Sequence, residues 1–149
     1  MQIDSRPATD ADTDFARATH HAAYREVVEL QFGSWDEQSQ NLFFAADWQP
    51  DSVEIICVEG ARCGYWLVEV RDLDIHVREL VIHPNYQGRG IATNLLMGLR
   101  AAALERGKPI RLGTFHRNRA VNLYRRLGFR EIGSTDTHVL MEWVPGTEP

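Results

Sequence analysis

The chain has little positive charge. Sixteen Lys and Arg residues stand against 21 Asp and Glu residues, which gives a formal net charge of −5 at pH 7. Proteins that bind nucleic acid or anionic lipid surfaces present clusters of basic side chains to the phosphate groups. We therefore expect neither nucleic acid nor a membrane as the main partner, although a local basic cluster could still bind a small anion.

Long apolar segments are also missing. No stretch of the sequence approaches the roughly 20 consecutive apolar residues that span a bilayer as a helix. Residues 1–14 lack both the basic start and the apolar core of a secretory signal peptide. Together these two absences predict a cytoplasmic location.

Cysteine is scarce, and its placement does not indicate a metal site. Cys57 and Cys63 flank an expected hairpin turn and could face each other across two strands. In a reducing compartment they are best interpreted as small apolar strand residues. Of the six histidines, the adjacent His20 and His21 should point in different directions on a helix. No Cys or His spacing is typical of zinc binding, so we expect no bound metal.

The length and composition are those of one globular domain. The chain has 149 residues, of which 44% are apolar and 25% are charged. It contains no obvious linker, internal repeat or low-complexity tract. We therefore expect a single domain over residues 1–149, for which a homodimer is a reasonable oligomeric state.

The periodicity of apolar residues predicts alternating strands and helices. A capping-box spacing at Ser34 and Glu37 indicates that the second helix begins near Trp35. The expected strands are 3–6, 53–58, 64–70, 75–82, 110–115, 129–132 and 139–144. The expected helices are 9–30, 35–47, 89–106 and 118–127. This order predicts an α/β (α+β) fold with a mixed, mostly antiparallel sheet of about six to seven strands and helices on both faces.

The segment Asn85–Ala92 places two glycines between a strand and a helix. Glycine is unfavourable inside either element, so the presence of Gly88 and Gly90 at this point requires an explanation. The free N–H groups and the dipole of a helix N-terminus favour an anion such as phosphate. Glycines let the backbone approach that anion, and Arg89 adds a cation. The turn therefore predicts a pyrophosphate site.

Two common phosphate motifs do not fit this turn. A P-loop would require Lys and then Ser or Thr after its last glycine, whereas Gly90 is followed by Ile91 and Ala92. A dinucleotide-binding fingerprint has three glycines at the start of a parallel βαβ unit, and this turn follows an expected antiparallel meander.

The turn instead resembles the signature of the GNAT acetyltransferases, Gln/Arg-x-x-Gly-x-Gly/Ala. Gln87, Gly90 and Ala92 fill the defined positions. The segment 118–129 is similar to the second motif of that family, in which Asn and Ala precede a Tyr and a Gly-Phe pair. The resemblance covers nearly the whole chain.

This resemblance implies an enzyme that moves an acetyl group from acetyl-CoA to a primary amine by direct attack in a ternary complex. The strands that carry Ile82 and Ile110 would separate to admit the cofactor, and Asn118 would contact its pantetheine arm. The backbone beside that arm would be that of Leu80, Val81 and Ile82. The pyrophosphate would be held by Gln87, Gly88, Arg89, Gly90, Ile91 and Ala92.

In the family, Tyr124 would lie near the sulfur, where a phenol can protonate the departing thiolate. The alternative is a core aromatic, because Tyr124 shares a helix face with Val121 and Leu127. Asn118 could also cap its own helix, which is compatible with cofactor contact. The backbone N–H of Val81 or Ile82 would stabilise the oxyanion.

The motifs do not assign the general base to one position. An alkyl ammonium has a pKa of about 10, so it must lose a proton before it attacks. Glu79, one residue before the cofactor-contacting segment of its strand, could take that proton through water, attract the substrate cation, or form an ion pair with Arg78, Arg111 or another arginine of a strand. His76 and His116 are rivals.

The acceptor and the wider function stay open. The aromatic residues Phe32, Trp35, Phe43, Phe44 and Trp48 could anchor two helices to the sheet or form a wall for an amine with an apolar body. A non-catalytic acyl-CoA sensor is an alternative to an enzyme, and so is a family member that acts on a drug or a charged tRNA. The negative net charge disfavours tRNA.

Overall fold

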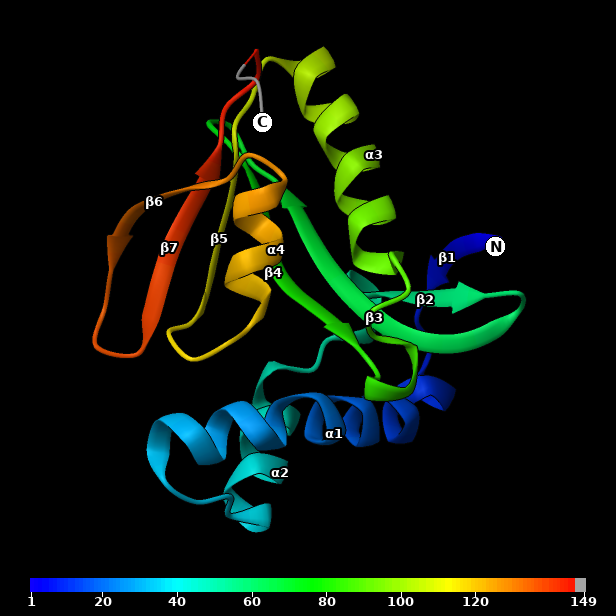
Figure 1. The fold of residues 1–149 in the computed structure, drawn as a ribbon. Helices are drawn as coiled ribbons and strands as arrows, with labels where there is room; N and C mark the ends of the chain where they lie inside the picture. The colour runs from blue at the N-terminus through cyan, green and yellow to red at the C-terminus, as the bar shows by residue number, and fades with distance from the viewer. Residues whose placement is uncertain (147–149) are drawn as a thin grey trace. The chain divides into compact units, whose positions relative to one another are not determined.

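A computed structural model describes residues 1–146 and shows a seven-stranded sheet in the order β1-β2-β3-β4-β5-β7-β6 (Figure 1). Its strands are β1 (Ile3–Pro7), β2 (Glu54–Val58), β3 (Ala61–Val70), β4 (Ile75–Ile82), β5 (Ile110–Phe115), β6 (Arg130–Ser134) and β7 (His138–Trp143). The α-helices are α1 (Thr13–Phe32), α2 (Glu37–Asp47), α3 (Ile91–Arg106) and α4 (Ala120–Arg126). Short 3-10 helices cover Asp10–Asp12, Pro50–Ser52 and Pro84–Tyr86.

The predicted fold class is confirmed. The pairs β1–β2, β2–β3, β5–β7 and β6–β7 are antiparallel. Strands β4 and β5 are parallel, and α3 connects them, as expected for a β-α-β crossover. The sheet is therefore mixed and mostly antiparallel.

The helix starts differ from the predicted ones. Thr9 caps the short 3-10 helix, so α1 begins only at Thr13. The capping box expected at Ser34 was wrong, because Asp36 keeps an extended backbone and is the N-cap of α2. The Ser39 hydroxyl hydrogen-bonds the Asp36 carboxylate there. Local polar contacts, which apolar periodicity does not report, set these boundaries.

The chain divides into two compact units, and each is described by itself. Unit 1 comprises residues 1–67 and 79–89, and unit 2 comprises residues 68–78 and those from 90 onward. The expectation of one domain over residues 1–149 stays a prediction.

The core of unit 1 lies between α1, α2 and the strands β2 and β3. The neighbouring β2 residues Ile55 and Ile56 are both fully buried, so both faces of this strand are covered. Phe44 stacks on Trp48 with ring centroids 5.3 Å apart, and the Trp48 indole donates to the Thr13 hydroxyl at 3.0 Å. Phe44 and Trp48 thus anchor α2. This agrees with the first of the two interpretations of the aromatic residues, in which they anchor helices rather than form a wall for the amine.

A buried carboxylate ties the ends of unit 1 together. Asp12 accepts hydrogen bonds from Arg6 at 2.9 Å, from Arg62 at 3.1 Å and from the Thr9 backbone N–H at 2.9 Å. The Arg6 hydrogen bonds are the main reason that the pKa of Asp12 lies well below its ordinary range. Asp12 is thus the centre of an ion network at the start of α1.

The two cysteines do not face each other. Glu59 and Gly60 form the β2–β3 turn, both with positive φ, and a bulge after Ile56 pairs Cys57 with Arg62. Both thiols are buried and unbonded to each other, in agreement with small apolar strand residues. Burial raises the pKa of the Cys63 thiol to about 11, and the neighbouring Cys57 adds to this.

Unit 2 packs α3 and α4 with the strands β5, β7 and β6 (Figure 1). The Arg100 guanidinium of α3 lies 5.1 Å from the Trp143 ring of β7 and donates to the Leu127 carbonyl at 3.3 Å. Residues of both helix and sheet are fully buried there, namely Leu96, Ala103, Ile110 and Met141.

A second ion network closes the start of β4 and β5 in unit 2. Buried Asp74 accepts hydrogen bonds from Arg71 at 2.7 and 2.8 Å and from Arg111 at 3.2 Å. These contacts, those of Arg71 first, hold the pKa of Asp74 below its ordinary value. Arg111 also donates to Glu142 at 2.8 Å. Its guanidinium therefore belongs to this network.

Gly64 permits an unusually close approach of β3 to β4 within unit 1. A Cβ atom at Gly64 would collide with the Val81 carbonyl oxygen and would lie 3.1 Å from the Ile82 Cα. The His83 backbone N–H donates to the Cys63 carbonyl at 2.8 Å beside this contact. The end of β4 thus packs against Gly64, where there is no room for a side chain.

We expect Gly64→Ala to lower the free energy of unfolding by about 3 kcal/mol, because backbone atoms cannot move aside as a flexible side chain can. Gly98→Ala, in the exposed interior of α3 with no atom within 4 Å of the new Cβ, should raise it by up to about 1 kcal/mol. Urea unfolding of both variants measures the two effects. A Gly64→Ala protein as stable as wild type would contradict the close approach.

Candidate active site

The turn between β4 and α3 has the backbone conformation expected of an anion site. Gly88 has φ 76° and Gly90, the N-cap of α3, has φ 84°, and both lie in the left-handed region. A Cβ atom at either position would have no neighbour within 4 Å. The glycines are therefore required by their φ angles, and the space beside them is open to a ligand. Because the first N–H groups of a helix have no intrahelical acceptor, these residues fit a phosphate group.

Side chains on both sides of the glycines hold the turn. The Gln87 side-chain amide donates to the Ile82 carbonyl at 2.9 Å, so it ties the turn to the end of β4. The Arg89 guanidinium lies 5.1 Å from the centre of the Tyr86 ring. Gln87 thus acts within the chain through its side chain, while its backbone stays part of the turn.

Strand β4 extends beyond its pairing with β5. The register joins Ile75 to Ile110, His76 to Arg111 and Val77 to Leu112, and β4 then continues to Ile82. Residues 79–82 form the end of β4, where the cofactor arm is expected from the sequence. Of the residues predicted to run beside that arm, Val81 and Ile82 are buried and Leu80 is half-buried.

Tyr124 is a buried residue of α4. Only 7% of it is exposed, and its ring lies 5.7 Å from that of Phe129. The core packing that the sequence allowed is therefore present, and the role as an acid stays a prediction. The N-cap of α4 is Arg119 and not Asn118 as expected, but the Asn118 side chain still accepts a hydrogen bond from the Ala120 N–H at 2.9 Å.

Glu79 meets a phenol that the sequence did not indicate. The Tyr24 hydroxyl of α1 donates to the Glu79 carboxylate at 3.1 Å. The pKa of buried Tyr65 is raised well above its ordinary value, first by burial and then by the charges of Glu79 and Asp47. Two phenol and two carboxylate side chains therefore share one region of unit 1. No spacing in a single sequence marks Tyr24 as the partner of Glu79.

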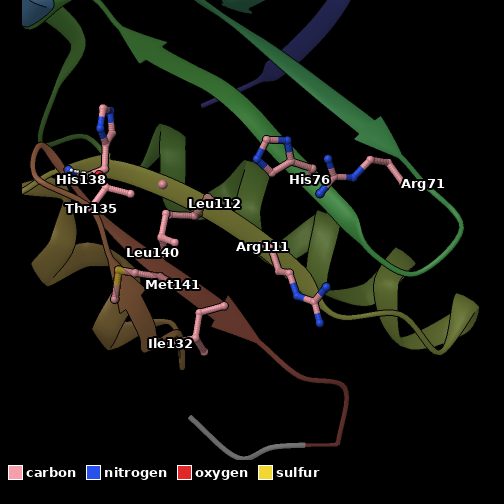
Figure 2. Close-up of a pocket in the computed structure, with 10 residues that line it drawn as sticks. Arg71, His76, Arg111, Leu112, Ile132, Thr135, His138, Leu140 and Met141 are labelled. Atoms are coloured by element: carbon pink, nitrogen blue, oxygen red, sulfur yellow. Dashed lines mark hydrogen bonds between the residues drawn. The ribbon is translucent and has the colours of Figure 1, made fainter.

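The two rival bases lie in unit 2 and are both engaged. The Nδ1 atom of His76 is 3.3 Å from Glu69, and the Nε2 atom of His116 is 2.8 Å from the Thr135 carbonyl. His76 lines an open depression of about 370 Å³ on the sheet, together with Arg71, Arg111, Ile132 and Leu140 (Figure 2). His116 is exposed.

The adjacent histidines of α1 contact each other, contrary to the expectation that they diverge. The two Nδ1 atoms of His20 and His21 are 2.9 Å apart, and His21 Nε2 is 2.7 Å from the Asn41 side-chain oxygen. The His20 ring packs on Tyr24 at 4.8 Å. Burial, with a smaller effect of His21, lowers the pKa of His20 to about 4. His20 is therefore uncharged at neutral pH.

Among residues 1–146, no three His, Cys, Asp or Glu side chains are grouped so that they could hold a metal ion. None of the helices in this part of the chain is long and apolar enough to cross a membrane.

A sequence model of the acetyltransferase (GNAT) domain matches residues 39–131. The chain belongs to this family. The predictions of a GNAT fold and of an acetyltransferase enzyme are confirmed at this level. No curated protein matches the sequence.

Solved structures share the fold at low sequence identity. PaiA N-acetyltransferase from Thermoplasma acidophilum, in complex with coenzyme A, has a TM-score of 0.78 and 14% identity over 97% of this chain and 99% of that chain. PH1933 from Pyrococcus horikoshii OT3 has a TM-score of 0.74 and 18% identity over 98% and 100% of the two chains. The ribosomal-protein-S18-alanine N-acetyltransferase from Escherichia coli has a TM-score of 0.62 and 18% identity over 99% and 97%.

The His20 environment predicts a loss of stability in mild acid. Its pKa is 6.5 ordinarily and about 4 in the folded chain, so the unfolded chain binds more protons between these values. Stability from this group is present above pH 6.5 and is lost as the pH falls toward 4, by up to about 3 kcal/mol. We expect His20→Phe, which keeps a ring against Tyr24, to reduce this loss.

Urea unfolding of wild type and His20→Phe at pH 7 and pH 4.5 measures the difference. Comparing the two proteins cancels the contribution of carboxylates that titrate in both. An equal acid-induced loss in the two proteins would contradict the buried, neutral state of His20.

Proposed function

We propose that this protein is an N-acetyltransferase that transfers an acetyl group from acetyl-CoA to a primary amine of a small molecule or peptide. Attack of the amine would be direct, within a ternary complex. The observation that carries the proposal is the turn with two left-handed glycines at the N-terminus of α3, in a chain of the GNAT family. The net charge of −5 supports an enzyme with neither nucleic acid nor membrane as its main partner, and we expect this enzyme to be cytoplasmic. We assign this activity to a single domain over residues 1–149.

The donor would be held mainly by backbone groups. The N–H groups of the turn and of the first helical residues would bind the pyrophosphate, and the backbone of β4 would bond the pantetheine amides as an added strand does. Asn118 would reach the same arm. When bound, acetyl-CoA supplies an acetyl group activated as a thioester. The residues assigned to its binding are Leu80, Val81, Ile82, Gln87, Gly88, Arg89, Gly90, Ile91, Ala92, Asn118 and Tyr124.

Tyr124 would move a proton to the leaving group. Its hydroxyl is neutral at rest and can donate to the departing sulfur, which needs no charged group in a buried position. The packing of its ring supports this role, because a ring held on Phe129 keeps its hydroxyl in one place. Backbone N–H groups of Val81 or Ile82 would stabilise the negative charge that develops on the acetyl oxygen.

Glu79 would act on the acceptor. Its carboxylate would receive the proton of the ammonium group, directly or through water, so that the amine becomes nucleophilic. Glu79 immediately precedes the β4 residues assigned to the donor, and Tyr24 holds its carboxylate. His76 and His116 are weaker candidates, since Glu69 and the Thr135 carbonyl engage their ring nitrogens.

An acetyl-transfer screen with acetyl-CoA and a panel of amines tests the proposal. The panel should contain polyamines, amino acids, peptide N-termini and aminoglycosides. Turnover with at least one amine is expected. Tight binding of acetyl-CoA with no turnover on any amine would instead favour an acyl-CoA sensor.

Gly90→Asp is expected to abolish binding of acetyl-CoA, because its carboxylate would stand where the pyrophosphate binds. Gly107→Asp is the matched control, since Gly107 caps the other end of α3 with φ 65° and equally open surroundings. Calorimetry should show one-to-one binding to wild type and to Gly107→Asp. Unchanged affinity in a folded Gly90→Asp protein would exclude the phosphate site.

Tyr124→Phe should lower kcat by roughly 10²- to 10⁴-fold with little change in acetyl-CoA affinity, because the ring keeps its packing and loses only its proton. Steady-state kinetics and a thermal melt of the variant measure both properties. If chemistry limits turnover and kcat stays within about threefold of wild type, Tyr124 is a core residue only.

A further inference from the structure

Arg89 differs from the arginines that stabilise the two units. Arg6 and Arg71, for example, each donate to a buried carboxylate. Within residues 1–146, Arg89 has no hydrogen bond and no ion pair, and its guanidinium instead lies over the Tyr86 ring, 5.1 Å from the centroid. A guanidinium that is stacked on an aromatic ring makes contact through its face. Its N–H groups, which lie in the plane, therefore stay available to an anion from outside the chain.

The backbone that carries Tyr86 is held by hydrogen bonds. Tyr86 ends the 3-10 helix Pro84–Tyr86, and its N–H donates to the His83 carbonyl at 2.8 Å. The His83 N–H donates in turn to the Cys63 carbonyl of β3, also at 2.8 Å. The Tyr86 side chain is half-buried. The ring beneath Arg89 is therefore connected through two hydrogen bonds to the sheet of unit 1.

The segment around Arg89 contains no acidic side chain. Residues 80–104 include neither Asp nor Glu, in a chain that has 21 of them. Acidic residues are favourable in the first turn of a helix because of the helix dipole, yet α3 has none there. Its N-cap, Gly90, provides no side-chain acceptor either. The positive end of α3 and the Arg89 guanidinium thus follow each other along the chain without a local carboxylate to neutralise them.

We propose that Tyr86 is a positioning residue for the donor: its ring holds the Arg89 guanidinium beside the glycine turn, where the N–H groups of Arg89 bind the pyrophosphate of acetyl-CoA. This inference rests on the proposed function, which assigns the turn to that pyrophosphate. It adds a residue that precedes Gln87 and fills none of the defined positions of the GNAT signature.

The physical reason is the conformational freedom of arginine. An exposed arginine has many rotamers, and binding an anion costs the entropy of fixing them. A contact that already limits the side chain in the free protein reduces this cost, and a cation over a ring at an exposed site changes an equilibrium by roughly two- to fivefold. The face of a Phe ring would serve as well as that of Tyr86, because the contact does not use the hydroxyl. Leucine offers no such face.

NMR of the ligand-free protein tests the contact itself. The ring current of Tyr86 should shift the Nε–H signal of Arg89 away from the signals of exposed arginines. The shift should remain in Tyr86→Phe and disappear in Tyr86→Leu. No ligand and no turnover are needed, so this result is independent of whether the proposed function holds.

Calorimetry with CoA then tests the effect on the donor. Tyr86→Leu should weaken binding by roughly three- to fivefold, and Tyr86→Phe should bind as wild type does. The matched control is Phe15→Leu, which removes another contact of this kind in unit 1, that of Arg62 at 4.6 Å, and should leave the affinity unchanged. In an Arg89→Gln background, Tyr86→Leu should cost little more, since the two residues act as a pair.

The same titrations with 3′-dephospho-CoA identify the phosphate that Arg89 binds. Both ligands carry the pyrophosphate, so Tyr86→Leu should weaken the binding of both by the same factor. A loss that is seen with CoA and is absent with 3′-dephospho-CoA would assign Arg89 to the 3′-phosphate and overturn the inference.

Two further results would also overturn it. Unchanged or tighter CoA binding in Tyr86→Leu, with the Arg89 shift abolished, would show that the contact does not serve the donor. A loss of affinity that is equally large in the Arg89→Gln background would leave Tyr86 a purely structural residue. Failure of the proposed function would be seen separately, because a protein that binds CoA and transfers acetyl to no amine would leave these results intact.

Discussion

The close approach of β3 to β4 at Gly64 is the constraint on which the candidate site depends. The backbone of Gly64 lies against the Val81 carbonyl, where even a methyl group would collide. This contact seats residues 79–82 of β4, and the amide of Gln87 then ties the following turn back to Ile82. The contact at Gly64 thus supports three neighbouring features of the chain. They are the carboxylate of Glu79, the end of β4 beside the expected cofactor arm, and the glycine turn before α3.

Within residues 1–146, the two buried carboxylates, Asp12 and Asp74, are paired with arginine near the ends of helices and strands. Asp12 binds Arg6 and Arg62 in unit 1, and Asp74 binds Arg71 and Arg111 in unit 2. Each carboxylate has several donors, which offsets the cost of removing it from water. Arg111 is therefore committed to Asp74 and Glu142. An ion pair of Glu79 with Arg111, one of the structural alternatives for Glu79, gains no support from this network.

Around Glu79 in unit 1, the contacts described above are with groups other than arginine. Here the neighbours are phenols, further carboxylates and a histidine that burial keeps neutral. Among the aromatic residues near α2, Phe44 and Trp48 stack on each other, whereas Phe43 of α2 and Phe32 at the end of α1 are more than half exposed.

The sequence alone was sufficient for the family, the order of the elements and the glycine turn, since these depend on local periodicity and on backbone angles that only glycine adopts readily. It also indicated the core position of Tyr124 and a hydrogen bond from Asn118 at the start of α4, because both depend on residues close in the chain. It did not reveal Asp12 as an ion centre, the bulge that separates Cys57 from Cys63, the contact between His20 and His21, or the hydrogen bond from Tyr24 to Glu79. Three of these four depend on register or on side-chain contacts between elements. The fourth depends on rotamers chosen by the packing of α1 against Phe44 and Asn41. Residue spacing does not predict such contacts, because they form only when distant parts of the chain pack together and exclude water.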